Sequence, residues 1–203
     1  MSDGDKTSTH PEQPEQPEQP EQPEQPEQPE HSHSAPATPT EHLAYVALGA
    51  NLADPQAQVR AAARALAGVA ECRLQRLSSL YRTAPVGGRI IRSQADFINA
   101  VAALHTRLTP AQLLDALLAI ERVFGRRREY HHAPRTLDLD LLLYDDLVVD
   151  SQRLSLPHPR MHLRAFVIAP LLEIAPQALI PGRGRAAAWL PAVSRQAVER
   201  LAD

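Results

Sequence analysis

The sequence predicts an α+β sandwich, in which helices flank a mainly antiparallel sheet, preceded by a disordered tail. Three observations support this prediction. Nine of the 19 prolines lie in the first 42 residues, where the triplet Pro-Glu-Gln repeats six times between 11 and 28. From residue 43 onward, apolar runs typical of strands interleave with stretches of helical periodicity. The connection between the second and third strand segments is too short for a helical crossover, so neighbouring strands should pair antiparallel.

The tail, residues 1–42, is expected to be disordered because its repeats contain no apolar side chain and place a proline at every third position. It carries ten acidic side chains and one lysine, whereas residues 43–203 carry 20 arginines and 14 acidic side chains. A tail of net charge −9 thus precedes a single domain of net charge +6. A glutamate beside each proline suits aromatic proline-binding grooves poorly, so a solubilising spacer is the preferred interpretation.

The domain begins with an apolar run, residues 43–48, that predicts a buried strand, and a Gly-Ala-Asn turn at 49–51 follows it. Asp54 and Pro55 are typical of the cap and first position of a helix. Apolar side chains continue at helical spacing to Leu66, so this helix should pack on the sheet.

Residues 72–82 and 97–106 are predicted as two further strands, separated by a loop with two glycines. The next helix has the clearest boundaries in the chain. Thr109 and Gln112 form a capping box with proline in the first turn, and a leucine-rich stripe ends at Gly125.

A strand is predicted at 137–144 after an arginine-rich loop. A helix over 161–168 should stop before Pro170, and a last, alanine-rich helix fits 186–202. Taken in order, these elements favour an α+β sandwich of ferredoxin-like type.

Several protein classes are excluded by composition. No run reaches the eighteen or so apolar residues of a membrane helix, and the first residues lack the apolar stretch of a signal peptide. The single cysteine, Cys72, excludes an intramolecular disulfide framework and a cysteine-built zinc site. A soluble cytoplasmic protein is therefore expected.

Asp138 and Asp140 are the most informative polar residues. They lie two apart in a predicted strand, so both carboxylates project from one face while the leucines between and around them face the core. Such a pair needs compensation, either by Arg135 and the preceding arginines in an ion-pair ladder or by hard divalent cations such as magnesium.

The arginines upstream favour the second explanation. Arg126, Arg127, Arg128 and Arg135 lie in a polar loop between a helix end and the carboxylate strand, and this loop could close as a lid over a nucleotide. Carboxylate-held cations and arginines together are what phosphoryl transfer requires. A solvated basic loop is the alternative for the arginines alone.

A second group combines an aromatic ring with an amide. Phe97 and Asn99 share one face of their strand, an arrangement that suits a flat heterocycle such as a pterin, stacked on the ring and recognised along its edge. On these two residues alone, a core phenylalanine and a hydrogen-bonded buried amide is the commoner explanation. His158, between two prolines, could contact phosphate or cap a helix.

Seven stretches, in order, resemble the hydroxymethyldihydropterin pyrophosphokinases of folate biosynthesis. They extend over most of the domain, from 43 to about 181, and the PRTLDLD segment is highly specific, whereas the tail has no counterpart. The stretches are AYVALGANL (44–52), SSLYRTAPVG (78–87), DFINAV (96–101), the E-x-x-x-G-R-x-R run (121–128), APRTLDLDLLLY (133–144), LPHPRMHLRAFV (156–167) and APLLEIAP (169–176).

The resemblance implies an enzyme, a diphosphotransferase that moves pyrophosphate from ATP to 6-hydroxymethyl-7,8-dihydropterin and releases AMP by direct in-line attack. It also implies two Mg²⁺ ions, held by Asp138 and Asp140, with Arg126 and Arg135 as the catalytic arginines. The remaining residues it assigns are Thr83, Val86, Phe97, Asn99 and Phe166 for the pterin, and Glu121, Arg128, His131, Leu141, Ser155, His158 and Arg164 for ATP.

Some positions depart from the family pattern. His131 and His132 stand in the mobile loop where arginine and either tryptophan or asparagine are common, so a weaker or pH-dependent grip on ATP is expected there. Phe97 and Pro159 each replace a frequent tyrosine, and Ala84 a frequent proline.

Two other classes of protein fit the sequence less well than an enzyme does. A non-catalytic nucleic-acid-binding module fits the +6 charge of the domain, but the two carboxylates would repel a phosphate backbone and exposed aromatics on the central strands are missing. An interaction scaffold that uses the tail leaves Asp138 and Asp140 unexplained. A monomer that binds ATP and the pterin, without nucleic acid or membrane, is the resulting expectation.

Overall fold

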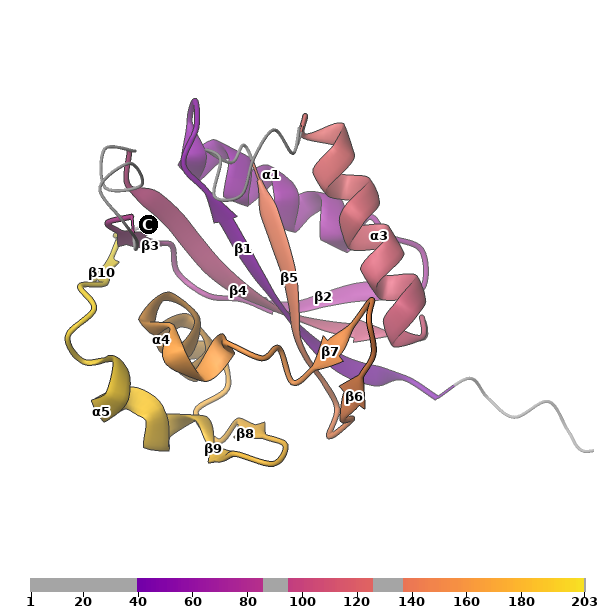
Figure 1. Cartoon of the computed structure of the whole chain (residues 1–203). Coiled ribbons are helices and arrows are strands. Elements are labelled where there is room, and N and C mark those ends of the chain that lie inside the picture. Colours follow the sequence, from indigo (N-terminus) through magenta and orange to yellow (C-terminus); the bar gives the residue numbers. More distant parts are fainter. Residues whose placement is uncertain (1–39, 86–94, 126–136, 203) are drawn as a thin grey trace, which may run out of the picture. The chain divides into compact units, whose positions relative to one another are not determined.

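The computed structural model describes residues 40–85, 95–125 and 137–202. Within these ranges, six strands join in one sheet: β1 (His42–Ala50), β2 (Cys72–Leu77), β3 (Tyr81–Thr83), β4 (Phe97–Thr106), β5 (Asp138–Tyr144) and β10 (Glu199–Arg200). The order across the sheet is β10-β3-β4-β1-β5, with β2 also paired to β4, and every pairing is antiparallel (Figure 1). A mixed α/β fold with a mainly antiparallel sheet is therefore confirmed.

Helices and short ladders complete the described part of the chain. The α-helices are α1 (Pro55–Ala67), α3 (Pro110–Val123), α4 (Ala165–Ile174) and α5 (Leu190–Val193), and the 3₁₀ helices are η1 (Met161–Leu163) and η2 (Ala186–Trp189). Two further ladders pair β6 (Val149–Asp150) with β7 (Ser155–Leu156) and β8 (Leu179–Ile180) with β9 (Gly184–Arg185). None of the helices in these ranges combines the length and apolar character needed to cross a bilayer.

β1 is the central strand and pairs on both sides, with β4 along all nine of its residues and with β5 from Ala44 to Gly49. Alternate residues of β1 enter different cores, because successive side chains of a strand point to opposite faces. Val46 and Leu48 lie in the core under α1 and α3, whereas Tyr45 and Ala47 pack on the α4 side. The strand runs on through Gly49, which had been predicted to lie in a turn.

α1 and α3 cover one face of the sheet, and both begin as the sequence predicts. The Asp54 side chain accepts a hydrogen bond from the Ala57 N–H at 3.0 Å, which caps α1. At α3 the capping box is complete, since Thr109 and Gln112 each bond the other's backbone N–H. These caps satisfy N–H groups that have no partner within the helix, so both helix starts are set locally.

The other face is covered by α4, which packs on β4 and β3 (Figure 1). A helix over 161–168 that ends before Pro170 proves wrong, because only a 3₁₀ turn occupies 161–163 and α4 runs from 165 to 174 with Pro170 inside it. Proline removes one N–H from the helix ladder. Burial of Ile168, Leu171 and Pro170 itself in the core outweighs that loss.

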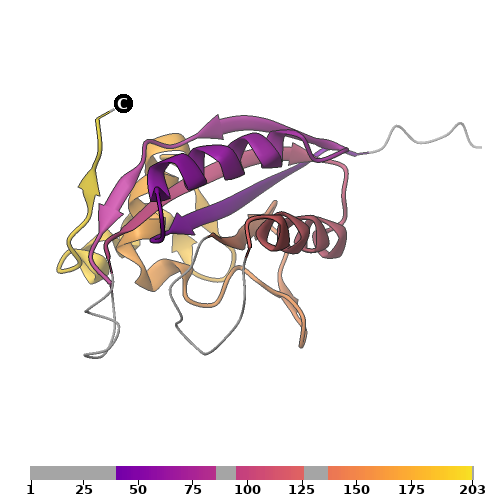
Figure 2. The ribbon, with the colours of Figure 1, turned by 90° about the horizontal axis from the view of Figure 1, so that it is seen from above.

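The predicted helix over 186–202 is also wrong. This segment forms η2, one turn of α5 and then β10, which pairs with β3 at the sheet edge, where Figure 2 shows the yellow β10 beside the magenta β3. Pro191 lies in the first turn of α5, where proline is tolerated. In the interior of a longer helix the exposed Pro191 would cost a backbone hydrogen bond without the burial that offsets this loss at Pro170. Gln196 bonds to Leu163 O and to Ala165 N, so tertiary contacts replace helix continuation.

The strand predicted at 72–82 divides into β2 and β3. The Ser78 hydroxyl accepts a hydrogen bond from the Val101 N–H at 3.0 Å and the Ser78 N–H donates to Val101 O at 2.9 Å. A side chain thus takes one place in the ladder to β4, and the chain bends before β3 begins.

We predict that Val59→Ala, which truncates a fully buried α1 side chain, lowers the free energy of unfolding by about 2 kcal/mol through lost burial and an unfilled cavity. Val123→Ala is the matched control, because Val123 is 85% exposed on α3 and its truncation should change stability by less than about 0.5 kcal/mol. Urea denaturation followed by circular dichroism measures both. Equal losses in the two variants would contradict the assigned core.

Candidate active site

Two carboxylates project from β5 toward the α4 side of the sheet. Asp138 and Asp140 are half-buried, while Leu139 and Leu141 lie in the core on the opposite face. Their neighbours on β1 are small, since Asp138 pairs with Gly49 and Asp140 with Ala47. The predicted arrangement of the two carboxylates on one strand face is confirmed, and the small neighbours leave room beside them.

Asp140 lies close to two side chains from the segment after β7, those of Arg164 and His158. Arg164, the residue before α4, donates from Nη1 to Asp140 Oδ2 at 3.3 Å, and His158 Nε2 lies 3.8 Å from the same oxygen. The side chains of His158 and Arg164 are only 16% and 22% exposed. The ion pair between Arg164 and Asp140 is therefore partly shielded from water, which strengthens the attraction between the two charges.

Burial lowers the pKa of His158, and the charges of Arg164 and Arg160 act in the same direction, although Asp140 opposes them. Burial likewise lowers the pKa of the Arg164 guanidinium, again against the effect of Asp140. His158 Nδ1 accepts the Arg160 N–H at 3.2 Å, so the neutral ring carries its proton on Nε2, the atom that faces Asp140. The neutral His158 ring thus presents an N–H donor, at Nε2, beside the Asp140 carboxylate.

Asn99 forms the second polar group on the same face of the sheet. It is 5% exposed, and its Nδ2 donates to Thr83 Oγ1 at 2.9 Å and to Tyr81 O at 3.4 Å. Both hydrogens of the amide are therefore committed to β3, which fixes the orientation of the side chain. Gly49 lies on the other side, where a Cβ would approach Asn99 Oδ1 to 3.3 Å.

Strand register connects the two groups. Asp138, Gly49, Asn99 and Tyr81 are successive partners across β5, β1, β4 and β3. Asp138 and Asn99 are thus separated by one strand, roughly 10 Å at the backbone. The carboxylates and the amide consequently face a common surface.

Two aromatic residues lie near this surface. Phe97 begins β4, two residues before Asn99 on the same face, and is half-buried. Phe166 lies in the first turn of α4, and its ring is 5.5 Å from the Arg164 Cζ, a cation–π contact. Arg164 thus contacts both a carboxylate and an aromatic ring.

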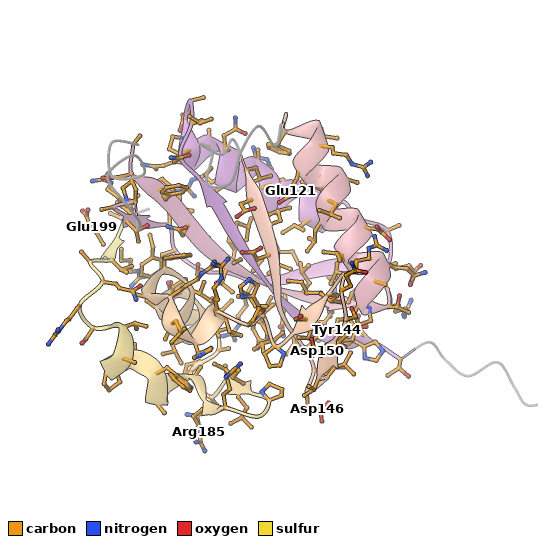
Figure 3. All side chains as sticks on the ribbon, viewed as in Figure 1. Glu121, Tyr144, Asp146, Asp150, Arg185 and Glu199 are labelled. Atoms are coloured by element: carbon orange, nitrogen blue, oxygen red, sulfur yellow. The ribbon has the colours of Figure 1, made fainter. Side chains whose placement is uncertain are left out.

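Three further residues that the resemblance assigns to ATP lie on α3, β5 and β7. Glu121, on α3, is 2% exposed and accepts the Leu139 N–H at 2.8 Å, so it anchors β5 from the core side (Figure 3). The Leu141 side chain is buried in the same core. Ser155 lies on β7, where it pairs with Asp150. Val86, Arg126, Arg128, His131 and Arg135 lie outside the described residues, as do Arg127 and His132.

The carboxylate pair suits a hard cation. Magnesium binds through one or two carboxylates and completes its shell with water and substrate phosphates, so a third protein ligand is not needed. No cluster of three or more His, Cys, Asp or Glu side chains arranged to hold a metal occurs within residues 40–85, 95–125 and 137–202. Two carboxylates are enough for a magnesium ion that arrives with phosphate ligands.

Sequence reasoning missed two residues of this surface. The sequence pattern places Gly49 in a turn, although glycine within a strand often marks the close approach of another group, here Asn99. Tyr81 supplies a carbonyl to Asn99, and no local signal identifies that contact because the residues are 18 apart in the chain.

Residues 45–176 match the family model described as 7,8-dihydro-6-hydroxymethylpterin-pyrophosphokinase (HPPK). Among curated relatives, the 2-amino-4-hydroxy-6-hydroxymethyldihydropteridine pyrophosphokinase of Pseudomonas aeruginosa is 45% identical over 157 residues, which cover 77% of this chain and 95% of the relative. Proteins of the same name from Haemophilus influenzae and Bacillus subtilis are 44% and 41% identical, covering 84% and 80% of those relatives and 68% and 67% of this chain.

Solved structures show the same fold. The crystal structure of Plasmodium falciparum HPPK-DHPS with pteroate has a TM-score of 0.60 to this chain at 13% identity, covering 79% of this chain. The chain spans only 46% of that longer protein, and at this identity the likeness concerns the fold alone.

We predict that Thr83→Val lowers the free energy of unfolding by about 1–3 kcal/mol, because it removes the acceptor of a buried Asn99 donor. Thr83→Ser, which keeps the hydroxyl, is the control and should cost clearly less. Urea titrations compare the two variants. Equal stability of the serine and valine variants would show that the Asn99 amide does not depend on Thr83.

Proposed function

The chain belongs to the 7,8-dihydro-6-hydroxymethylpterin-pyrophosphokinase family, and we propose how its residues divide the work of that reaction. It transfers pyrophosphate from ATP to 6-hydroxymethyl-7,8-dihydropterin in folate biosynthesis. The strand register across β5, β1 and β4 is the main support for the roles proposed for individual residues, because it directs Asp138, Asp140 and Asn99 to one surface.

We infer that the pterin hydroxymethyl oxygen attacks the β-phosphorus of ATP directly, in line with the bond to the α-phosphate oxygen, and that AMP leaves. Such a transfer needs no nucleophile from the protein, so positioning and charge neutralisation are what the side chains supply. Arg126 and Arg135, which lie outside the described residues, are the proposed catalytic arginines.

Asp138 and Asp140 are the proposed ligands for two magnesium ions, which, when bound, supply positive charge to the ATP phosphates. Their half-buried position on one strand face, beside Gly49 and Ala47, supports this role. Arg164 pairs with Asp140 in this structure, and in the complex it is proposed to contact the triphosphate as well, because an arginine fork can serve two anionic partners.

The other proposed ATP contacts differ in how they reach the nucleotide. His158 carries its Nε2 proton toward Asp140 and so offers a donor to a phosphate oxygen. Ser155 and the Leu141 backbone are proposed nucleoside contacts, and Arg128 and His131 are proposed from outside the described residues. Glu121 is proposed to act through β5, whose Leu139 N–H it accepts.

The pterin is proposed to stack between Phe97 and Phe166, with Thr83, Asn99 and the backbone of Val86 along its edge. Since the Asn99 donors are committed to β3, its Oδ1 is the atom proposed to accept a ring N–H. The edge of the heterocycle would then be recognised by an acceptor whose orientation is already fixed, which lowers the entropy lost on binding.

Other aspects of the protein are proposed on sequence grounds. We propose that residues 1–42 form a disordered tail and residues 43–203 the catalytic domain, and that the protein is a cytoplasmic monomer that binds no nucleic acid. The ferredoxin-like description is supported by the strand order β3-β4-β1-β5 with α1 and α3 on one face, which is the order of a split β-α-β unit repeated once.

The reaction is tested by incubating the full chain with ATP and magnesium, with and without 6-hydroxymethyl-7,8-dihydropterin, and separating the nucleotides. AMP should form only with the pterin, in equal amount to the pterin diphosphate. Formation of ADP and phosphate instead would contradict pyrophosphoryl transfer.

We predict that Asp138→Ala and Asp140→Ala each lower kcat by about 10³-fold or more, because cation-assisted charge stabilisation is lost. Asp150→Ala, at an exposed β6 carboxylate, is the control and should retain wild-type activity. Circular dichroism checks that all three variants are folded. Substantial activity in both site variants would contradict the two-metal assignment.

A further inference from the structure

The Glu173 carboxylate, near the end of α4, accepts hydrogen bonds from strands β3 and β10 and from Ser79, which lies just before β3. Its oxygens accept the Tyr81 hydroxyl at 2.8 Å, the Ser79 hydroxyl at 2.8 Å and the Ser79 N–H at 3.2 Å. Arg200 of β10 donates to Glu173 from Nη2 at 3.2 Å and to the Ser79 hydroxyl from Nε at 2.9 Å. One carboxylate therefore joins α4 to β3, to the residues just before it and to β10.

The protonation states favour this arrangement. Burial acts to raise the pKa of Glu173, but the hydrogen bonds from Ser79 and Tyr81 and the charge of Arg200 outweigh it and lower the pKa. Burial, and then the bond to Glu173, raise the pKa of Tyr81 to about 12. An ionised carboxylate thus faces a neutral phenol donor at neutral pH.

These hydrogen bonds connect the two sides of the proposed pterin site, Asn99 on β4 and Phe166 on α4. Tyr81, whose hydroxyl bonds Glu173, offers its backbone carbonyl to Asn99, and Thr83 lies two residues further along β3. At the other end of α4 stands Phe166. Glu173 is thus bonded to the strand that orients Asn99 and belongs to the helix that carries Phe166.

We propose that Glu173 is a positioning residue for the pterin site, which sets α4 and its Phe166 against β3 and the Asn99 amide it holds. This proposal rests on the proposed function for the identity of the ligand. It assigns Glu173 no contact with substrate or with the reacting atoms.

Apolar packing already attaches α4 to the sheet. Val167, Ile168 and Leu171 are fully buried in the core that α4 shares with β4 and β5. Loss of the carboxylate should therefore leave the fold in place while it loosens β3 relative to α4. The expected effect is on the recognition of one substrate.

Glu173→Gln tests the proposal, because it keeps the size of the side chain but removes the charge and one acceptor. We predict that the KM for 6-hydroxymethyl-7,8-dihydropterin rises about tenfold while kcat and the KM for ATP change less than about threefold, as expected for lost hydrogen bonds of a charged group. Glu199→Gln is the matched control. Glu199 is 64% exposed at the outer edge of β10 (Figure 3) and pairs only with Arg82 among the ion pairs of the described residues, so its variant should match the wild type.

A second variant and a second measurement keep the proposal testable if Glu173→Gln folds poorly. Tyr81→Phe removes only the hydroxyl that bonds Glu173 and should raise the pterin KM in the same direction. In both variants the side-chain amide signals of Asn99 in ¹⁵N–¹H NMR spectra should shift without ligand, whereas Glu199→Gln should leave them unchanged.

Unmoved Asn99 signals with an unchanged pterin KM would overturn the proposal, and so would equal rises in the KM of both substrates. Failure of the proposed function is separate, because it would appear as a wild-type protein that forms no pterin-dependent AMP, while the Asn99 signals still report on positioning.

The pH dependence of stability gives a further prediction. Because folding lowers the pKa of Glu173 below its ordinary value of 4.5, its stabilising contribution is complete above that pH and is lost as pH falls through the folded-state pKa. The wild type should melt at a higher temperature than Glu173→Gln near pH 7, and the difference should shrink below pH 4.5. Thermal melts from neutral to acidic pH measure this, and a constant difference would contradict an ionised Glu173.

Discussion

The register of β1 with its two neighbours is the constraint on which the site depends. Because side chains alternate between the faces of a strand, a slip of one residue between β1 and β5 would carry Asp138 and Asp140 into the α1 and α3 core and expose Leu139 and Leu141. That exchange would bury two charges, so the register is strongly determined. The polar surface of the protein is thus a consequence of how its apolar core packs.

The two faces of the sheet differ in what they bury. Under α1 and α3 the core is mostly aliphatic, with Tyr144 among its buried residues and with Glu121 accepting the Leu139 N–H. On the α4 face, apolar packing at Val101 and Leu142 gives way, toward the β5 start, to carboxylates and an amide. Charge on this face is balanced locally, with Arg164 against Asp140 and Arg200 against Glu173. The apolar face under α1 and α3 therefore contributes stability, whereas the α4 face presents polar groups that are available to bind ligands, with Asp140 and Glu173 each balanced by an opposite charge.

Local signals predicted most of the sheet and its first helices. Caps at Asp54 and Thr109 and the alternation around Asp138 act within a few residues, so they are visible in the sequence. The prediction for the segment after residue 186 is wrong because its alanine content favours a helix, whereas the backbone pairing of β10 with β3 joins Glu199 to Arg82, residues 117 apart. The alternation of each strand predicts that Phe97 and Asn99 share one face and that the two aspartates share one face. That both pairs lie on the same face of the sheet follows only from the strand registers, and the Tyr81–Glu173 bond joins residues 92 apart, so neither is visible in the sequence.

α4 brings together groups that are proposed to serve different substrates. Arg164, just before the helix, bonds Asp140 on the side assigned to ATP, and its guanidinium also lies over the ring of Phe166 on the side assigned to the pterin. A shift of Arg164 toward a phosphate would therefore change the support of that ring, since a cation–π contact depends on the cation lying over the ring face. Meanwhile the buried residues of α4 hold the helix on β4 and β3, so such a shift must be taken up by side chains at its first turn rather than by the helix as a whole. The two halves of the site are thus coupled through a few atoms at one helix end.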